Sequence, residues 1–328
     1  MRSNNKTMNQ EKINFRQVRD FGETFNVSVK FLRQNAKLFF QCILFIAGPF
    51  ILLSAIAGAF YQSNAINMFS INRLGSGGID SLLQQFGWAY LLFILAAILA
   101  SLASMATVFS FMINYLEKGP GGFTVSDVQR TVTQNIGNVL GVFFSFTLLI
   151  ILIVVVIVVI IAGIGTAVPA IGILLALFLL LGMLMILPPF MWQMSATYLV
   201  KMTEQKGVFE SFRRTRQVMR DNFWWTWVIV VCATMAIGLA GIVFSLPQAG
   251  YQMFLMFSHL KDGGGDIPVG FLIVATICTF CTTLLYSTLS VIIGFHYFSL
   301  AEKKDGTGLM DRINEIGNAP VNNVEQQY

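Results

Sequence analysis

Cysteine and histidine are the residues of this chain best suited to metal or redox chemistry, and there are only six of them. Cys278 and Cys281 form a C-x-x-C pair, a spacing typical of redox and zinc sites. The pair lies inside an apolar segment with no second pair and no histidine nearby, so we interpret it as two small residues on one helix face. His259 and His296 have no carboxylate, serine or cysteine at a catalytic spacing, and we interpret both as surface or interface histidines.

Hydroxyl side chains are concentrated in the last apolar segment, residues 269–300. Small hydroxyl residues often pack one membrane helix against another and bond to the carbonyls of their own helix. The alternative is that they face a polar conduit, because hydroxyls can also line a cavity. The conduit would be lined by Thr279, Thr283, Tyr286, Pro188 and Pro189, the two prolines marking an expected kink.

Charged residues are absent from the central part of every apolar segment. Ion-coupled pumps and proton relays need such groups within the membrane. Intramembrane hydrolases need a carboxylate pair, a serine–histidine pair or a metal cluster, and no phosphate-binding Gly-Lys-Ser/Thr loop is present. We therefore expect no enzyme activity, no catalytic residue, no metal and no cofactor.

Six apolar segments dominate the chain, which is 55% hydrophobic and 11% charged. A bilayer core needs about 20 helical residues to cross, and lipid leaves an unpaired backbone group without a partner. The fold class expected is therefore all-α, a polytopic membrane bundle of six transmembrane helices. The segments are residues 38–60, 88–116, 138–162, 168–200, 223–247 and 269–300.

Lysine and arginine are sorted onto one side of these segments. Of the 21 basic residues, 19 fall at the two chain ends and in two connections, and only Arg73 and Lys261 fall in the opposite connections. Basic loops remain in the cytoplasm, so both termini are predicted to be cytoplasmic in a multi-pass protein of the inner membrane. The net charge of +5 belongs to residues beside the membrane and does not indicate nucleic-acid binding.

A threefold pattern organises the segments into three hairpins, each preceded by a cytoplasmic interfacial amphipathic helix. An asparagine stands shortly before the first, third and fifth segments (Asn35, Asn135 and Asn222). The repeats predicted are residues 15–118, 119–206 and 207–305 of one transmembrane domain. Residues 1–14 are predicted to be disordered and residues 306–328 to form a cytoplasmic tail.

Basic residues on the first and third interfacial helices are candidates for contact with anionic lipid or a protein partner. Each basic residue near an anionic surface contributes about 1 kcal/mol. The alternative is that these charges only fix the topology. The candidates are Arg33, Lys37, Arg213, Arg214, Arg216 and Arg220.

Phe209-Glu210-Ser211-Phe212, followed by Arg216 and Asn222-Phe223-Trp224, resembles a motif of a bacterial membrane domain, with a weaker echo at Val27 to Asn35. This six-span domain accompanies glycerophosphoryl diester phosphodiesterases and also occurs in stand-alone integral membrane proteins of unknown function. The catalytic barrel of the phosphodiesterase, with its acidic metal ligands, is absent from this chain. The resemblance implies an auxiliary or lipid-proximal role in the membrane and not the phosphodiesterase activity.

Two functions follow as hypotheses. The first is a non-enzymatic inner-membrane scaffold or auxiliary subunit that contacts anionic lipid headgroups or a cytoplasmic partner. The second is a transporter or channel for a neutral or lipid-like solute, with the three hairpins surrounding a cavity.

Overall fold

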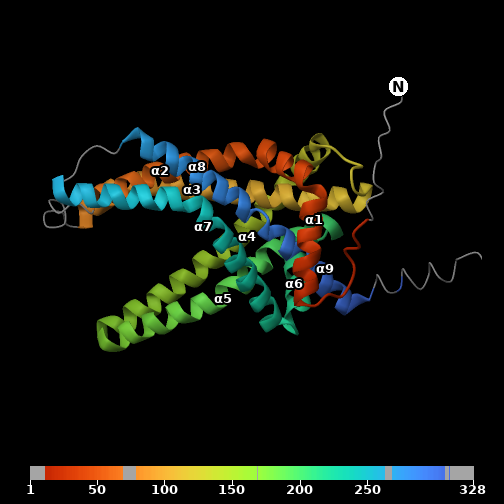
Figure 1. The fold of residues 1–328 in the computed structure, drawn as a ribbon. Helices are drawn as coiled ribbons and strands as arrows, with labels where there is room; N and C mark the ends of the chain where they lie inside the picture. The colour runs from red at the N-terminus through yellow and green to blue at the C-terminus, as the bar shows by residue number, and fades with distance from the viewer. Residues whose placement is uncertain (1–11, 69–78, 168, 263–267, 307–309, 311–328) are drawn as a thin grey trace, which may run out of the picture.

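The computed structural model describes residues 12–68, 79–167, 169–262, 268–306 and 310, and its helices are shown in Figure 1. Within these residues every regular element is a helix, as expected for an all-α membrane bundle. The elements are α1 (Phe21–Cys42), the π-helix η1 (Ile43–Ala47), α2 (Gly48–Met68), α3 (Ile79–Lys118), α4 (Val125–Ala167), α5 (Pro169–Glu204), α6 (Val208–Arg220), α7 (Phe223–Asp262), α8 (Val269–Tyr286) and α9 (Leu289–Asp305).

Six stretches of helix are long and apolar enough to cross a membrane, which confirms the predicted number of spans. Several are longer than a crossing requires. The helix α4 has 43 residues, or roughly 64 Å at 1.5 Å per residue, about twice the thickness of a bilayer core. The long helices therefore continue beyond the hydrocarbon, and much of the chain between the predicted segments, over residues 61–87 and 248–268, belongs to the ends of α2, α3 and α7.

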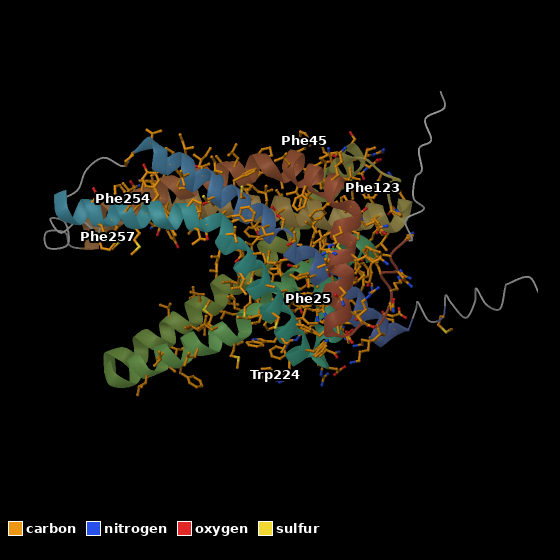
Figure 2. The ribbon with its side chains drawn as sticks, in the orientation of Figure 1. Phe25, Phe45, Phe123, Trp224, Phe254 and Phe257 are labelled. Atoms are coloured by element: carbon orange, nitrogen blue, oxygen red, sulfur yellow. The ribbon has the colours of Figure 1, made fainter. Side chains whose placement is uncertain are left out.

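Two arms diverge from a shared base (Figure 1). The four-helix arm consists of α2, α3, α8 and the second half of α7, and α7, which contains Pro247, bends into it from the base. The two-helix arm is the hairpin of α4 and α5. The base comprises α1, α6, α9 and the N-terminal residues 12–20. Figure 2 shows that the arms stay separate when their side chains are drawn, with Phe254 and Phe257 in the four-helix arm.

The first and sixth spans are interrupted. In the first, the π-turn η1 directly precedes Gly48-Pro49, and the wider turn accommodates the proline ring and its missing N–H. The sixth span, predicted as one helix, is broken between α8 and α9. There the amides of Thr288 and Val291 donate to carbonyls only three residues earlier, which is the tighter 3₁₀ pattern.

The fourth span continues as a helix through Pro188 and Pro189. Pro189 has no N–H to donate to the carbonyl of Met185, four residues earlier. The indole N–H of Trp227 on α7 donates to that carbonyl at 3.0 Å. Trp227 therefore supplies the missing hydrogen bond of α5 and connects α7 to α5.

The expected interfacial helices differ from one another in structure. Asp20 and Glu23 form a capping box that starts α1, and α1 crosses the direction of the arms in Figure 1. The third, α6, is a separate helix of 13 residues. The second has no separate helix, because residues 125–137 are the unbroken start of α4. The Asp127 carboxylate accepts the Thr124 N–H at 2.8 Å at the start of this helix.

The main core lies in the base and is aromatic. The ring of Phe31 lies 5.0 Å from Tyr115 and 5.4 Å from Phe295, and Phe15 lies 4.7 Å from Phe295. The disorder predicted for residues 1–14 does not reach residues 12–14. Ile13 is buried, and its N–H donates to the Tyr115 hydroxyl at 3.1 Å. The rest of that segment, and most of the predicted tail, lie outside the described residues.

Candidate functional site

A polar pocket of roughly 1060 Å³ opens at the base and is the first candidate site. The N-terminal segment, the ends of α3, α5 and α9, and α6 all contribute to its walls. The two described ends of the chain and the two basic connections therefore share one end of the molecule. This is the arrangement that the sorted lysines and arginines predict for an even number of spans.

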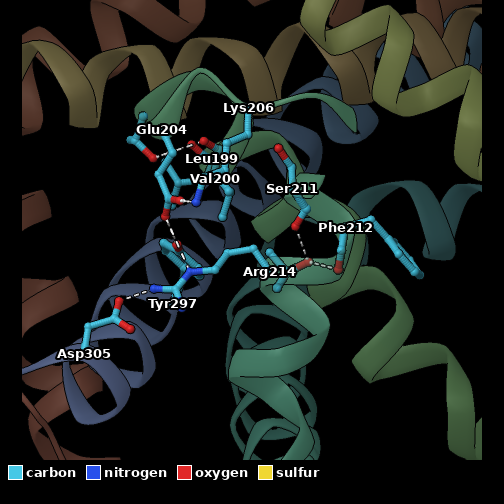
Figure 3. A network of polar contacts seen from close by, with 11 residues as sticks. Leu199, Val200, Glu204, Lys206, Ser211, Phe212, Arg214, Tyr297 and Asp305 are labelled. Atoms are coloured by element: carbon cyan, nitrogen blue, oxygen red, sulfur yellow. Dashed lines mark hydrogen bonds and ion pairs between the residues drawn. The ribbon is translucent and has the colours of Figure 1, made fainter. Parts of the chain in front are cut away.

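An ion-pair network forms one wall of this pocket (Figure 3). The Arg214 guanidinium on α6 contacts the Asp305 carboxylate at the end of α9, and its Nε lies 3.7 Å from Glu204 Oε1 at the end of α5. Glu204 also pairs with Lys206 at 2.5 Å and accepts the Tyr297 hydroxyl at 3.2 Å. Burial opposes the charged form of Arg214, but the hydrogen bond and charge of Asp305, with the charge of Glu204, raise its pKa overall.

Lysines around the pocket neutralise the ends of helices. Lys12 Nζ donates to the Leu116 carbonyl at 2.7 Å, near the end of α3. Lys304 donates to the Gln217 carbonyl at 2.8 Å, near the end of α6. The last carbonyls of a helix lack intrahelical partners and carry negative partial charge, so both contacts are favourable. Lys12 thus links the N-terminal segment to α3, and Lys304 links α9 to α6.

The helix α6 has three distinct faces. Its inner face, with Ser211, Thr215 and Val218, is buried against the bundle. One flank carries Arg214 and Gln217 into the polar pocket. The opposite flank carries Phe212, Arg216, Met219 and Arg220 into a separate apolar groove.

A buried polar seam fixes α6 on α5. Gln193 Nε2 donates to the Phe212 carbonyl at 3.0 Å and to Thr215 Oγ1 at 2.5 Å. The hydroxyls of Thr215 and Thr197 lie 3.0 Å apart and share a hydrogen bond. Buried polar groups need such partners to offset desolvation. The seam therefore sets the rotation of α6 and decides which of its arginines face which flank.

The structure separates the predicted interface residues into two kinds. Arg214 is an ion-pair partner within the base. Arg213, Arg216 and Arg220 on α6, and Arg33 and Lys37 on α1, are exposed. Among the described residues, none forms a hydrogen bond or ion pair with Arg213, Arg216 or Arg220. Three arginines of α6 thus remain available to a ligand, whereas the fourth is already used.

The predicted conduit residues are divided between the arms. Thr279, Thr283 and Tyr286 belong to α8 in the four-helix arm, whereas Pro188 and Pro189 belong to α5 in the two-helix arm. The Thr283 hydroxyl donates to the Thr279 carbonyl at 2.8 Å, the back-bonding expected of a packing residue. The Tyr286 ring packs beside Gly238 and Gly241 of α7.

His296 is buried, which corrects its interpretation as a surface or interface residue. Its Nε2 shares a hydrogen bond of 3.0 Å with the Thr226 hydroxyl, and its ring lies 5.8 Å from that of Trp192. The break before α9 turns this helix into the core, where a partnered imidazole can be buried. Cys278 and Cys281 are free thiols, and the side chain of His259 is outside the described part of the chain.

Arg19 is a structural residue that the sequence interpretation missed. Its side chain is 8% exposed, and its NH1 donates to the Phe15 carbonyl at 3.0 Å. The guanidinium carbon lies 5.7 Å from the Phe295 ring centre, within range of a cation–π contact. Burial lowers the pKa of this guanidinium. The capping box that begins at Asp20 was the available signal, because it fixes the chain just after Arg19.

Comparisons of this chain with protein-family models, with curated proteins and with solved structures gave no match. Among the described residues, no group of three histidine, cysteine, aspartate or glutamate residues is placed to hold a metal ion. The candidate site is therefore defined by its geometry, as a polar pocket and a basic outer flank on opposite sides of α6.

Proposed function

We propose that this chain is a non-enzymatic scaffold or auxiliary subunit of the bacterial inner membrane, with its base on the cytoplasmic side and in contact with anionic lipid. The observation that carries the proposal is the outer flank of α6, where three exposed arginines have no partner among the described residues. The positive-inside rule supports placing this basic end in the cytoplasm.

The apolar residues of α6 support lipid over water as the neighbour of this flank. Phe209 is 84% exposed and lies on the same face of α6 as Arg216, which comes two helical turns later in the chain. Aromatic and basic side chains on one exposed face are typical of helices that lie in the headgroup layer. The resemblance to the phosphodiesterase-associated membrane domain also favours an auxiliary, lipid-proximal role.

The test compares stability in two lipid environments. The purified full chain would be placed in nanodiscs of phosphatidylcholine with and without phosphatidylglycerol, and its thermal unfolding measured. We expect phosphatidylglycerol to raise the Tm of the wild type, and the variant R213Q/R216Q/R220Q to lose most of this increase. Arg130, an exposed arginine at the start of α4, provides the control variant Arg130→Gln, which should keep the increase.

A wild-type Tm that is equal in both lipids would overturn the proposal. A different result would point to a protein partner. If the wild type captured a soluble protein in a pull-down, and the triple variant lost that protein but kept the lipid-dependent Tm increase, the arginines would bind a cytoplasmic protein and not lipid.

A transporter for a neutral or lipid-like solute is the second candidate, and the break between α8 and α9 favours it. Discontinuous membrane helices form substrate sites in many transporters, and Ser287 and Thr288 at this break are buried hydroxyl residues. Flux through reconstituted vesicles that falls in Thr283→Val and Tyr286→Phe would support this function. Flux unchanged by both substitutions would show that Thr283 and Tyr286 do not line the solute pathway.

A further inference from the structure

An apolar groove of roughly 450 Å³ lies outside the polar pocket, between α6 and the two-helix arm. Its walls come from four consecutive helices, α4 to α7. Leu149 and Ile153 belong to α4, Ile186 and Phe190 to α5, and Phe223 to the start of α7. The fourth side is the outer flank of α6. Neither the polar pocket nor the ion-pair network uses this groove.

The charged residues of the groove lie at one end only, on α6, and the rest of its lining is almost entirely apolar. Arg216 and Arg220 are four residues apart on α6 and so lie on the same side of that helix, about 6 Å apart at their β-carbons. From Gln193, beside α6, to Ile186 the helix α5 rises roughly 10 Å along the arm. The groove therefore begins beside Arg216 and Arg220 at the base and continues along apolar side chains of the spans.

Every charged residue that lines the groove is an arginine. Arg216 and Arg220 have no hydrogen bond or ion pair within the described residues. Two like charges on adjacent turns repel one another by a few tenths of a kcal/mol. An anion between them would remove this repulsion and make charge-assisted hydrogen bonds with both groups.

A buried amide supplies a second, independent indication of a ligand. Gln193 also lines the groove and is 4% exposed. Its Nε2 is fully used by Phe212 and Thr215, whereas its Oε1 has no hydrogen-bond partner among the described residues. A buried acceptor without a partner costs about 1–3 kcal/mol. A hydroxyl or ammonium group of a bound molecule would remove that cost.

We infer that this groove binds one anionic phospholipid, with its phosphodiester between Arg216 and Arg220 and one acyl chain along α4 and α5. The inference rests on the proposed contact with anionic lipid and gives it a defined site. A phospholipid matches both ends of the groove, whereas a free anion would leave the apolar walls without a partner. The volume suits a headgroup and part of one chain, with the remainder of the lipid in the bilayer.

The experiment measures phosphatidylglycerol retained by the purified full chain after washing in detergent, by mass spectrometry of the intact complex. Two basic contacts of about 1 kcal/mol each correspond to roughly a 30-fold change in Kd. We therefore expect R216Q/R220Q to bind phosphatidylglycerol roughly 30-fold more weakly than the wild type. Arg213→Gln, which changes an arginine outside the groove lining, should retain the lipid.

A second pair of variants tests the apolar end. Ile186→Trp should fill the groove and release the lipid while both arginines remain. Leu184→Trp is the matched control, because Leu184 is 58% exposed on the same helix and does not line the groove. Circular dichroism of all variants checks that a loss of lipid does not reflect unfolding.

The outcomes separate the groove from the proposed function. Retention of phosphatidylglycerol by Ile186→Trp would show that the lipid does not bind in the groove. If the Tm still rose with this lipid, the proposed contact between α6 and anionic lipid would still be supported. Release of the lipid by inorganic phosphate alone would also overturn the lipid site in the groove, in favour of a phosphate site. A wild type with no preference for phosphatidylglycerol in either measurement would overturn the proposed function itself.

Discussion

The four-helix arm and the two-helix arm leave the same base, but the first two spans of the chain and the third differ in how deeply they are buried. In the most apolar 18-residue stretches of the first and second spans, which build the four-helix arm, 44% of residues are buried. In the third span, which forms half of the two-helix arm, only 6% are buried. The third span is also the more hydrophobic of these helices, with a mean hydropathy of 3.4. Among these three spans the most hydrophobic is the least buried, so hydropathy alone does not predict which spans pack together.

Residue size explains the difference. The four-helix arm places small residues where its helices meet, and Ala55, Ala59 and Ala275 are almost completely buried. The two-helix arm carries a run of large branched residues, 150–160, nearly all of which are exposed. Lipid tails are as apolar as leucine, so only close packing distinguishes a helix neighbour from lipid. Small residues allow this approach, whereas a continuous branched surface is solvated well by acyl chains.

The largest expected difference in stability is between two variants that each lose one aromatic ring, one in each arm. Phe271 is fully buried in the four-helix arm beside Leu255 and Ala275, so Phe271→Ala should leave a cavity and lower the free energy of unfolding by roughly 3 kcal/mol. Phe178 is 74% exposed in the two-helix arm, and Phe178→Ala should change it by less than about 0.5 kcal/mol. Unfolding in mixed detergent micelles measures both. Equal losses would show that the two-helix arm is packed against something in the folded protein.

A matched pair of glycine substitutions should give an intermediate effect. A β-carbon at Gly58 would lie 3.1 Å from the Phe93 ring, which stacks on Tyr61. A β-carbon at Gly182, in the two-helix arm, would have no neighbour within 4 Å. Gly182→Ala should therefore stabilise the chain by about 0.5–1 kcal/mol through helix propensity, and Gly58→Ala should be less stable than Gly182→Ala by about 1 kcal/mol. The same unfolding assay applies, and an equal gain from both would argue against close packing at Gly58.

The smallest effect concerns the ion pairs that connect the end of α5 with the end of α9. Asp305→Asn removes the partner of Arg214, and both side chains are partly exposed, so solvent reduces the expected loss to about 0.5–1 kcal/mol. A double-mutant cycle with Arg214→Gln isolates the pair from other effects. Arg213→Gln is the control, because this arginine has no ion pair among the described residues. Additive effects of Asp305→Asn and Arg214→Gln would mean that the two side chains do not stabilise one another.

The pattern of the chain predicts the number of spans, the hairpins and the shared basic end. It also predicts the exposed state of Arg213, Arg216 and Arg220. It does not predict the pairing of Arg214, because the partner carboxylate of Asp305 lies 91 residues away. The burial of His296 was missed for a similar reason, since it depends on a helix break and on Thr226 of another span.

The threefold repeat of residues 15–118, 119–206 and 207–305 stays a prediction. The three hairpins are present, but their leading helices differ: the first joins its span through the π-turn η1, the second is the unbroken start of α4, and the third is a separate helix. Similar asparagine markers thus precede three different local structures. An asparagine of this kind indicates where along the chain a span begins, but it does not predict the angle between the span and the helix before it.

The order of apolar and basic residues is enough to predict a multi-pass α-helical membrane protein with its basic residues gathered at one end. Both properties follow from transfer of single residues between water, headgroups and hydrocarbon, so no knowledge of neighbours is needed. Only the tertiary structure decided which spans pack together and which face of α6 meets the groove. Those choices depend on side chains from distant helices fitting within a few ångströms, and on buried contacts such as those of Gln193 with Thr215.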